Sequence, residues 1–129
     1  MTLVAMSPRS GVVARPCPLP RTRPAYTVSF AVGGAEGSFT AGVQSDGQPG
    51  EITLRMGKHG STLAGLAEAF SIVTSLALQH GVPVELIAER LRGLRFEPAG
   101  WTDDEQIPEA TSVMDYVGRR LALDFVPHP

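Results

Sequence analysis

The chain has 129 residues, of which 43% are hydrophobic and 19% are charged, so one packed domain is expected and wholesale disorder is excluded. The formal net charge of −2 at pH 7 gives no general attraction to nucleic acid or to anionic lipid. A single cysteine, Cys17, excludes an internal disulfide, a cysteine-based zinc site and a dithiol redox pair. No stretch approaches the ~20 apolar residues of a membrane span, so the composition favours a soluble, cytoplasmic protein.

Residues 1–24 differ from the rest of the chain in charge and in proline content. They contain four arginines, five prolines and no acidic residue, whereas the following residues are acidic overall. Closely spaced prolines prevent both a helix and a central strand. We therefore predict a flexible basic segment over 1–24, a folded domain over 25–126 and a short tail over 127–129.

Alternating apolar residues predict three strands after this segment. The alternation runs from Tyr26 to Val32, again from Phe39 to Val43, and a third time from Ile52 to Met56. The polar, Gly- and Pro-containing segment from Ser45 to Gly50 is typical of a hairpin turn. Because the connections are short, the three strands should form an antiparallel meander.

The hydrophobic period changes from two to about 3.6 after the third strand. This change predicts a long amphipathic helix that Ser61 or Thr62 caps and that ends near Gly81 and Pro83. Its predicted core face consists of Leu63, Leu66, Ala67, Phe70, Val73, Thr74, Ala77 and Leu78.

Two further helices complete the predicted fold. One has Pro83 in its first turn and stops at Gly93, and the other follows Pro108 and exposes Arg119 and Arg120 near its C-terminal end. Their predicted inner faces are Val84, Ile87 and Leu91, and then Val113, Met114, Val117, Leu121 and Phe125. The predicted fold class is α+β, in two layers, with an antiparallel three-stranded meander followed by three helices packed on one face.

Residues suited to catalysis do not form a recognisable constellation. None of the three histidines has metal-ligand spacing, and Cys17 lies among prolines with no predicted scaffold to hold a base beside it. Thr102 and Glu105 have capping-box spacing, so we interpret the acidic run Asp103–Glu105 as a solvated helix start rather than as paired catalytic carboxylates. A self-sufficient enzyme is not expected.

A glycine-rich segment between the third strand and the long helix is the first candidate binding site. Its residues are Gly57, Lys58, His59, Gly60, Ser61 and Thr62. Free N–H groups at a helix start, with a lysine and two hydroxyls, favour an anion such as the phosphate of a nucleotide. A phosphate loop, however, needs a glycine where this chain has Ile52. We therefore favour the alternative, a tight turn followed by a helix cap.

The second candidate is a loop that contains Arg95, Phe96, Glu97 and Trp101. Trp and Arg are enriched in interface hot spots, which makes the loop a candidate partner surface. In the alternative interpretation, the two aromatic side chains cover the open end of the core while Arg95 and Glu97 pair at its rim. The sequence leaves both interpretations open.

Several of these segments together resemble a known family. They are Gly33-Gly34 with Glu36-Gly37, the stretch from Gly57 to Gly65, Arg95-Phe96-Glu97-Pro98, and Asp115-Tyr116 followed by Arg119-Arg120. In these segments the chain closely resembles the C-terminal, or TSCPD, domain of adenosylcobalamin-dependent (class II) ribonucleotide reductases. The resemblance covers roughly Arg23 to Val126, which leaves Cys17 outside it.

The resemblance implies a link to deoxyribonucleotide synthesis. Full-length members of that family reduce ribonucleotides through a cobalamin-generated thiyl radical, a chemistry that needs several cysteines and a large catalytic barrel. This chain matches neither requirement, so no catalytic residue and no metal ligand is carried over. Adenosylcobalamin is bound by the barrel of the full-length proteins, and no cofactor is expected in this chain, which has no DxHxxG motif.

Two functional hypotheses follow from these observations. In the first, the chain is a stand-alone, non-catalytic accessory module that binds a class II reductase catalytic chain through the Arg95–Trp101 loop or the basic head. In the second, it is an effector module that holds a nucleotide or another anion at the Gly57–Thr62 helix start. Neither hypothesis requires a membrane or direct contact with nucleic acid.

Overall fold

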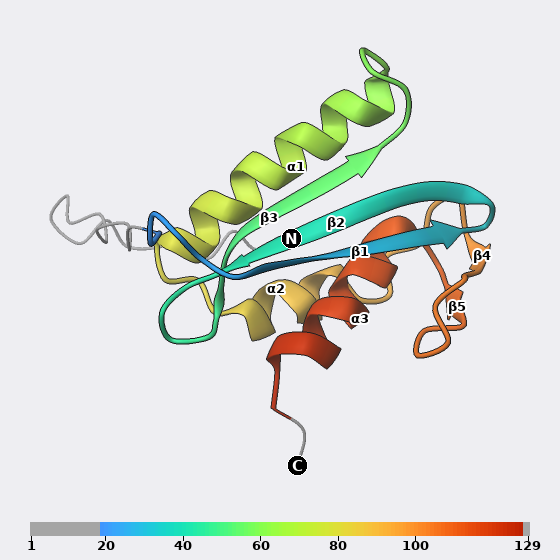
Figure 1. Cartoon of the computed structure of the whole chain (residues 1–129). Coiled ribbons are helices and arrows are strands. Elements are labelled where there is room, and N and C mark those ends of the chain that lie inside the picture. The colour runs from blue at the N-terminus through green and yellow to red at the C-terminus, as the bar shows by residue number, and fades with distance from the viewer. Residues whose placement is uncertain (1–18, 128–129) are drawn as a thin grey trace, which may run out of the picture.

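A computed structural model describes residues 19–127 as a three-stranded sheet, a two-stranded ribbon and three helices (Figure 1). The predicted flexible segment lies largely outside these residues, as does Cys17. In chain order the elements are β1 (Ala25–Val32), β2 (Ala35–Val43), β3 (Pro49–Met56), α1 (Thr62–Gln79), α2 (Val84–Leu91), β4 (Gly100–Trp101), β5 (Glu109–Ala110) and α3 (Val113–Phe125). The predicted α+β fold class is confirmed.

The sheet has the order β1-β2-β3, and both pairs of neighbours are antiparallel. A tight turn joins β1 to β2 through Gly33 and Gly34, whose φ angles of 56° and 85° favour glycine. Phe39 in the central strand pairs with Val28 on β1 and with Leu54 on β3. Because strand side chains alternate between faces, this register places the large apolar residues on one face of the sheet.

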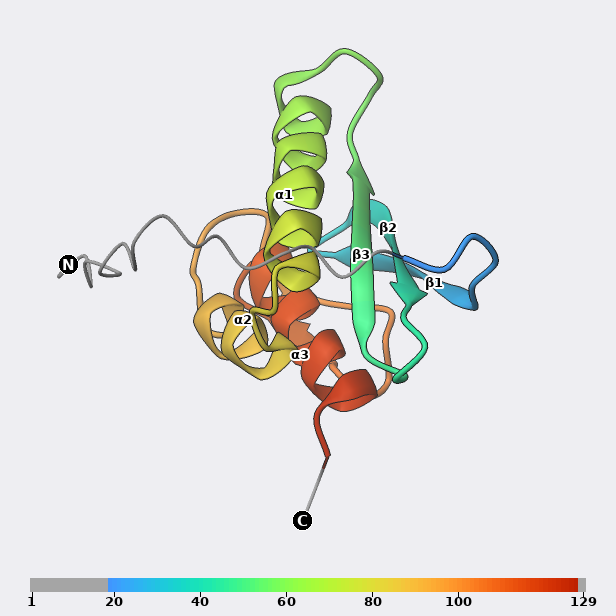
Figure 2. The same cartoon turned by 90° about the vertical axis from the view of Figure 1, so that its left-hand side faces the viewer.

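Helix α3 lies against this apolar face, and α2 packs on α3 (Figures 1 and 2). The Tyr116 ring of α3 stacks on Phe30 of β1 with their centroids 4.8 Å apart. Gly118 allows the two helices to approach closely, since a Cβ atom at this position would lie 2.9 Å from both Ala88 O and Leu91 Cβ. The core therefore sits between the sheet and α3.

Helix α1 occupies a different position, beside β3 (Figure 2). As an edge strand, β3 has backbone groups that point away from β2 and need other partners. Ser71 Oγ accepts a hydrogen bond from Leu54 N at 2.8 Å, and Ser75 Oγ accepts one from Ile52 N at 3.0 Å and donates to Ile52 O at 3.1 Å. The two serines thus take the place of a neighbouring strand.

The spacing of these bonds follows from the geometry of the two elements. Four helical residues advance ~6 Å, and two strand residues advance ~6.6 Å, so every fourth residue of α1 meets every second residue of β3. Gln79 continues the series one turn further, where its side-chain amide donates to Gly50 O at 3.0 Å. We call the bonds of Ser71, Ser75 and Gln79 to β3 the serine ladder.

The orientation of α1 corrects the predicted core face. Three of the residues predicted to be inside are exposed, at 44% for Leu63, 64% for Leu66 and 66% for Val73. The predicted residues Ala67, Thr74 and Leu78 are buried, together with Ser71, which was not predicted. The reason is that α1 packs on a strand edge whose polar backbone groups require small polar side chains. Leu63, Leu66 and Val73 are consequently turned outward.

The apolar character of α1 also bears on the expectation that no stretch approaches a membrane span. Among residues 19–127, α1 is one helix that is long and apolar enough to cross a membrane by length and composition alone. Core helices of soluble proteins pass the same test. In this structure its hydrogen bonds to β3 make α1 part of the folded domain.

The segment between α2 and α3 also differs from the prediction. No helix starts at Thr102, so Thr102 and Glu105 do not form a capping box. Instead, Thr102 Oγ1 accepts a hydrogen bond from Asp104 N at 3.1 Å and donates to Ile107 O. Strands β4 and β5 pair within this segment, where β4 also contacts β1 and β5 contacts α3.

Helix α3 begins at Val113 rather than directly after Pro108. Its cap is Ser112, whose hydroxyl accepts a hydrogen bond from Asp115 N at 2.9 Å. A side-chain cap of this kind satisfies a backbone N–H group that the helix leaves free, and therefore decides where the helix starts.

Removing one rung of the serine ladder should destabilise the fold. Ser71→Ala leaves the buried Leu54 N–H without its hydrogen-bond acceptor, and should lower the free energy of unfolding by about 1–3 kcal/mol. Ser45→Ala, in an exposed turn, is the matched control and should change it by less than about 0.5 kcal/mol. Urea unfolding followed by circular dichroism measures both values, and equal stability of the two variants would contradict the assigned role.

Candidate functional site

The loop from Arg95 to Trp101 lies at the end of the molecule where the β1–β2 turn also lies (Figure 1). Its backbone is held at both ends, because Phe96 N donates to Thr111 O at 3.1 Å and Gly33 N donates to Trp101 O at 2.9 Å. Strand β4, which contains Trp101, is also paired with β5. We call the seven residues Arg95–Trp101 the aromatic loop.

The β1–β2 turn presses closely against this loop. A Cβ atom at Gly33 would overlap the carbonyl group of Ala99, and the φ angle of 56° at Gly33 also disfavours a larger residue. The absence of a side chain at Gly33 therefore allows the turn to contact the backbone of the aromatic loop.

The side chains of the aromatic loop point largely into solvent. Trp101 is 73% exposed and Phe96 is 46% exposed, and Arg95 and Glu97 are exposed as well. Among residues 19–127, no salt bridge joins Arg95 to Glu97. The structure thus does not show the alternative in which the aromatics cover the core and the charges pair at its rim.

A buried carboxylate, which was not predicted from the sequence, anchors the segments on either side of this loop. Asp115 is fully buried and accepts hydrogen bonds from Gly93 N at 2.7 Å and Thr111 N at 3.0 Å. Arg119 Nε also donates to it at 3.2 Å. Burial raises the pKa of Asp115, but the hydrogen bonds from Gly93 and Thr111 and the charge of Arg119 outweigh it and lower the pKa overall. The Ser112-x-x-Asp115 capping pattern was the available sequence signal.

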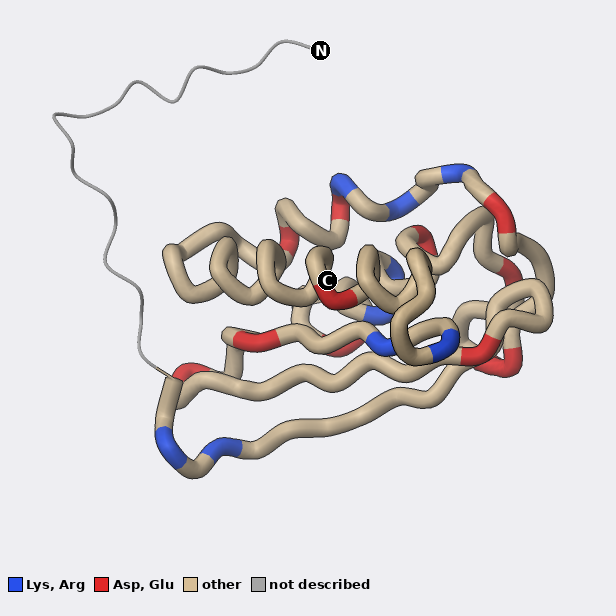
Figure 3. Tube along the Cα trace, turned by 90° about the horizontal axis from the view of Figure 1, so that it is seen from above, with Lys and Arg blue, Asp and Glu red and all other residues tan. Residues whose placement is uncertain are grey.

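A second charged cluster corrects the prediction that Arg120 is exposed. Its side chain is only 11% exposed and lies between Asp104, whose Oδ2 is 2.9 Å from Arg120 Nη1, and Asp124, whose Oδ1 is 2.7 Å from Arg120 Nη2. Tyr116 OH donates to Asp104 at 2.7 Å, and Tyr26 OH donates to Asp124 at 2.9 Å. This cluster joins the segment before β5 and strand β1 to α3 (Figure 3 shows the charges along the chain).

The protonation of this cluster reflects its mutual hydrogen bonds. Burial raises the pKa of Asp104, but bonds from Tyr116 and Arg120 outweigh it and lower the pKa. Burial and the bond to Asp104 raise the pKa of Tyr116. Asp104 is therefore a paired anion at neutral pH, and its bonds to Tyr116 and Arg120 connect the segment before β5 to α3.

The first candidate segment, Gly57–Thr62, forms a tight turn and a helix cap. Gly57 and Gly60 have φ angles of 77° and 81°, and Ser61 N donates to Lys58 O at 2.9 Å. Ser61 Oγ accepts a hydrogen bond from Ala64 N at 3.1 Å, which confirms Ser61 as the cap. One N–H group of the helix start is thus already satisfied by the protein, while the side chains of Lys58 and His59 are exposed.

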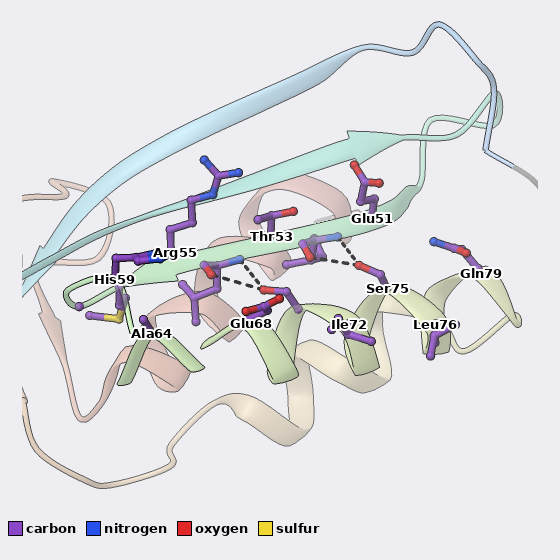
Figure 4. Close-up of a pocket in the computed structure, with 15 residues that line it drawn as sticks. Glu51, Thr53, Arg55, His59, Ala64, Glu68, Ile72, Ser75, Leu76 and Gln79 are labelled. Carbon is purple, nitrogen blue, oxygen red and sulfur yellow. Dashed lines mark hydrogen bonds between the residues drawn. The ribbon is translucent and has the colours of Figure 1, made fainter. Parts of the chain in front are cut away.

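A groove of about 720 Å³ runs from this segment along the contact between β3 and α1 (Figure 4). Its side chains include Glu51, Thr53, Arg55, His59, Glu68, Ile72, Leu76 and Gln79. Glu51 is paired with Arg23 at 3.0 Å, while Arg55 and Glu68 form no ion pair among residues 19–127. The lining is therefore mixed, with one cation and one anion available to a ligand.

The described residues contain no cluster of side chains that could hold a metal ion. Within residues 19–127 there is no group of three or more His, Cys, Asp or Glu side chains that could hold a metal ion. His80 Nδ1 is 2.9 Å from Leu76 O, a contact within its own helix, and His59 lies exposed in a turn.

The fold and the exposed loop together define a small α+β domain with a preformed aromatic surface. The model of the TSCPD domain family matches residues 12–125, and the chain belongs to this family. The match starts before Cys17, so this cysteine lies inside the family region, contrary to the expected boundary near Arg23. It remains outside the residues that the structure describes.

The chain is similar to proteins named vitamin B12-dependent ribonucleotide reductase. It is 54% identical over 109 residues to the protein from Streptomyces avermitilis, 42% over 108 residues to that from Rhodopirellula baltica, and 39% over 109 residues to that from Agrobacterium fabrum. Each match covers 84% of this chain but only 11%, 10% and 9% of the respective relative. No solved structure matches the chain.

The lowered pKa of Asp115 predicts acid sensitivity. Because its folded-state pKa lies below the unfolded value of about 4, its contribution to stability is present above that pH and is lost as the pH falls through the folded-state pKa. Asp115→Asn should lower the free energy of unfolding by about 2–4 kcal/mol at pH 7, and by clearly less near pH 2.

Urea unfolding at a series of pH values measures this dependence. Asp46→Asn, in an exposed turn, is the control and should leave the pH profile close to that of the unmodified chain. A loss of stability in Asp115→Asn that is the same at both ends of the pH range would show that the carboxylate charge is not what matters.

Proposed function

We propose that this chain is a non-catalytic accessory module that binds the catalytic chain of a vitamin B12-dependent, class II ribonucleotide reductase in the cytoplasm. The relatives carry a region like this one within proteins about ten times as long, so the module has a natural context beside a larger polypeptide. Reduction of the nucleotide, and binding of adenosylcobalamin, belong to the partner in this proposal.

The exposed aromatic loop is the single observation that supports this role most directly. Trp101 and Phe96 present large apolar surfaces beside the charged Arg95 and Glu97, a combination that is common in interface hot spots. Its backbone is already fixed by hydrogen bonds to Thr111 and Gly33. Binding through a fixed loop costs less conformational entropy than ordering a loose one.

The binding experiment uses the full chain and a class II reductase catalytic chain from the same cell. Isothermal titration calorimetry should detect a complex, and Trp101→Ala should raise its Kd by about 30-fold or more, as expected for an aromatic hot spot. Leu86→Ala is the matched control, because Leu86 is 42% exposed on α2 and does not belong to the loop. It should leave the Kd within about twofold.

Two outcomes would contradict the proposal. No detectable heat at about 100 μM of each protein would exclude a specific complex of useful affinity. An unchanged Kd for both Trp101→Ala and Phe96→Ala would show that the complex forms through another surface. Circular dichroism of each variant establishes that a loss of binding is not a loss of folding.

A second candidate function is nucleotide or anion binding at Gly57–Thr62. The observation that favours it is the α1–β3 groove, which starts at His59 and is large enough for a small ligand. Lys58 is exposed at the same turn, and the N–H groups of Thr62 and Leu63 precede the first intrahelical bonds of α1. A phosphate at this helix start would interact with the charge of Lys58 and with the N–H groups of Thr62 and Leu63.

Thermal unfolding with ribo- and deoxyribonucleotides tests this second function. A ligand at 100 times its Kd should stabilise the chain by about 2.7 kcal/mol, and Lys58→Ala should remove most of the rise in Tm. Arg90→Ala on α2 removes a cation elsewhere and should leave the rise unchanged. No shift at millimolar nucleotide would refute nucleotide binding without affecting the accessory-module proposal.

A further inference from the structure

Helix α1 carries apolar side chains on its outward face as well as on the face that packs against the domain. Its polar residues Ser71, Ser75 and Gln79 point toward β3, where they form the serine ladder. The side chains of Leu66 and Val73, which are 64% and 66% exposed, point away from the sheet. A helix of a monomeric domain normally presents its polar face to water. The outward face of α1 is thus typical of a surface that another protein element covers.

The exposed apolar residues have a regular spacing. Leu66, Ala69, Val73 and Leu76 follow one another at intervals of three, four and three residues, which is the spacing of a two-helix packing seam. At 100° per residue, all four lie on the side of the helix opposite Ser71. All four are exposed, and Leu76 is 50% exposed. We call these four residues the α1 seam.

The seam carries no charge. Glu68 is the one charged residue in the whole of α1, and it does not belong to the seam. A charged partner surface would therefore lose its hydration without gaining an ion pair here, whereas an apolar helix of similar spacing would not. Among residues 19–127, the N-terminal half of α1 projects past α2 and α3, so neither of these helices covers it (Figures 1 and 2).

We propose that the α1 seam pairs with the α1 seam of a second copy of this chain, in an antiparallel two-helix contact about a twofold axis. The arrangement is self-complementary. With the axis level with Ser71, Leu66 meets Leu76 of the other copy, and Ala69 meets its Val73. The small alanines near the axis allow the helices to approach, while the leucines close the contact at both ends.

The ends of the seam support the same register. About one helical turn beyond the leucines, Thr62 of one copy lies opposite His80 of the other. Polar residues therefore flank the apolar contact at both ends. No like charges meet in this arrangement, because the seam contains none. The contact leaves the aromatic loop, which belongs to the segment between α2 and α3, available for a different partner.

Analytical ultracentrifugation of the full chain tests the dimer. The unmodified chain should associate with concentration, and Leu66→Glu combined with Val73→Glu should raise the dimer Kd by on the order of 100-fold, because four carboxylates would be buried in an apolar contact. Leu86→Glu, at an exposed leucine of α2, is the control and should leave the Kd unchanged. Both positions of the seam variant are exposed, so it should remain folded, which circular dichroism checks.

Cysteine crosslinking tests the register. In a Cys17→Ser background, the double variant Ala69→Cys, Val73→Cys should form a disulfide-linked dimer, because the two positions face each other in the antiparallel pair. Each single variant should crosslink far less, whereas in a parallel pair each single variant would crosslink efficiently.

Three results would overturn the proposal. A chain that stays monomeric at about 1 mM would exclude the dimer. A dimer that survives the double glutamate variant would lie on another surface. If the chain is monomeric and the seam variant weakens binding to the reductase catalytic chain while Trp101→Ala does not, the seam is covered by that chain instead of by a second copy.

Discussion

The structure depends on how the free edge of β3 is closed. An edge strand with unpaired backbone groups would invite another strand, and here Ser71, Ser75 and Gln79 of α1 satisfy those groups instead. The closeness of the helical and strand repeats makes this match possible over several turns. Two consequences follow from it. Apolar residues of α1 face outward, and a groove remains along the contact between α1 and β3.

On the other side of the domain, buried charged side chains join the elements. Asp115 joins the end of α2 to the start of α3. Arg120 connects α3 to Asp104, and Asp124 connects α3 to Tyr26 of β1. Such groups are costly to bury, and their cost is offset only when every oxygen is hydrogen-bonded. No buried side-chain nitrogen or oxygen among the described residues lacks a partner. The hydrogen bonds of Asp115 to Gly93 and Thr111 thus hold the segments on either side of the aromatic loop.

These two features suit a domain that acts through its surfaces. Membership of the TSCPD family links the chain to proteins named vitamin B12-dependent ribonucleotide reductase, and the chain spans about a tenth of their length. The aromatic loop and the α1 seam lie on different elements, so one partner on each is geometrically compatible. Under the functions proposed above, the domain would connect a catalytic chain to a second copy of itself.

The sequence by itself determined the three strands of the main sheet, the three helices and the α+β class, and limited the cap of α1 to Ser61 or Thr62, because each depends on local periodicity and local hydrogen bonds. It also indicated the aromatic loop, but not whether its rings are buried. Only the tertiary structure decided that Trp101 is exposed and that Leu66 and Val73 face outward. The physical reason is that apolar periodicity marks a face of a helix without saying what that face meets. Here the serines of α1 bind the unpaired edge of β3. This contact joins two segments of the chain, so the pattern within either segment does not predict it.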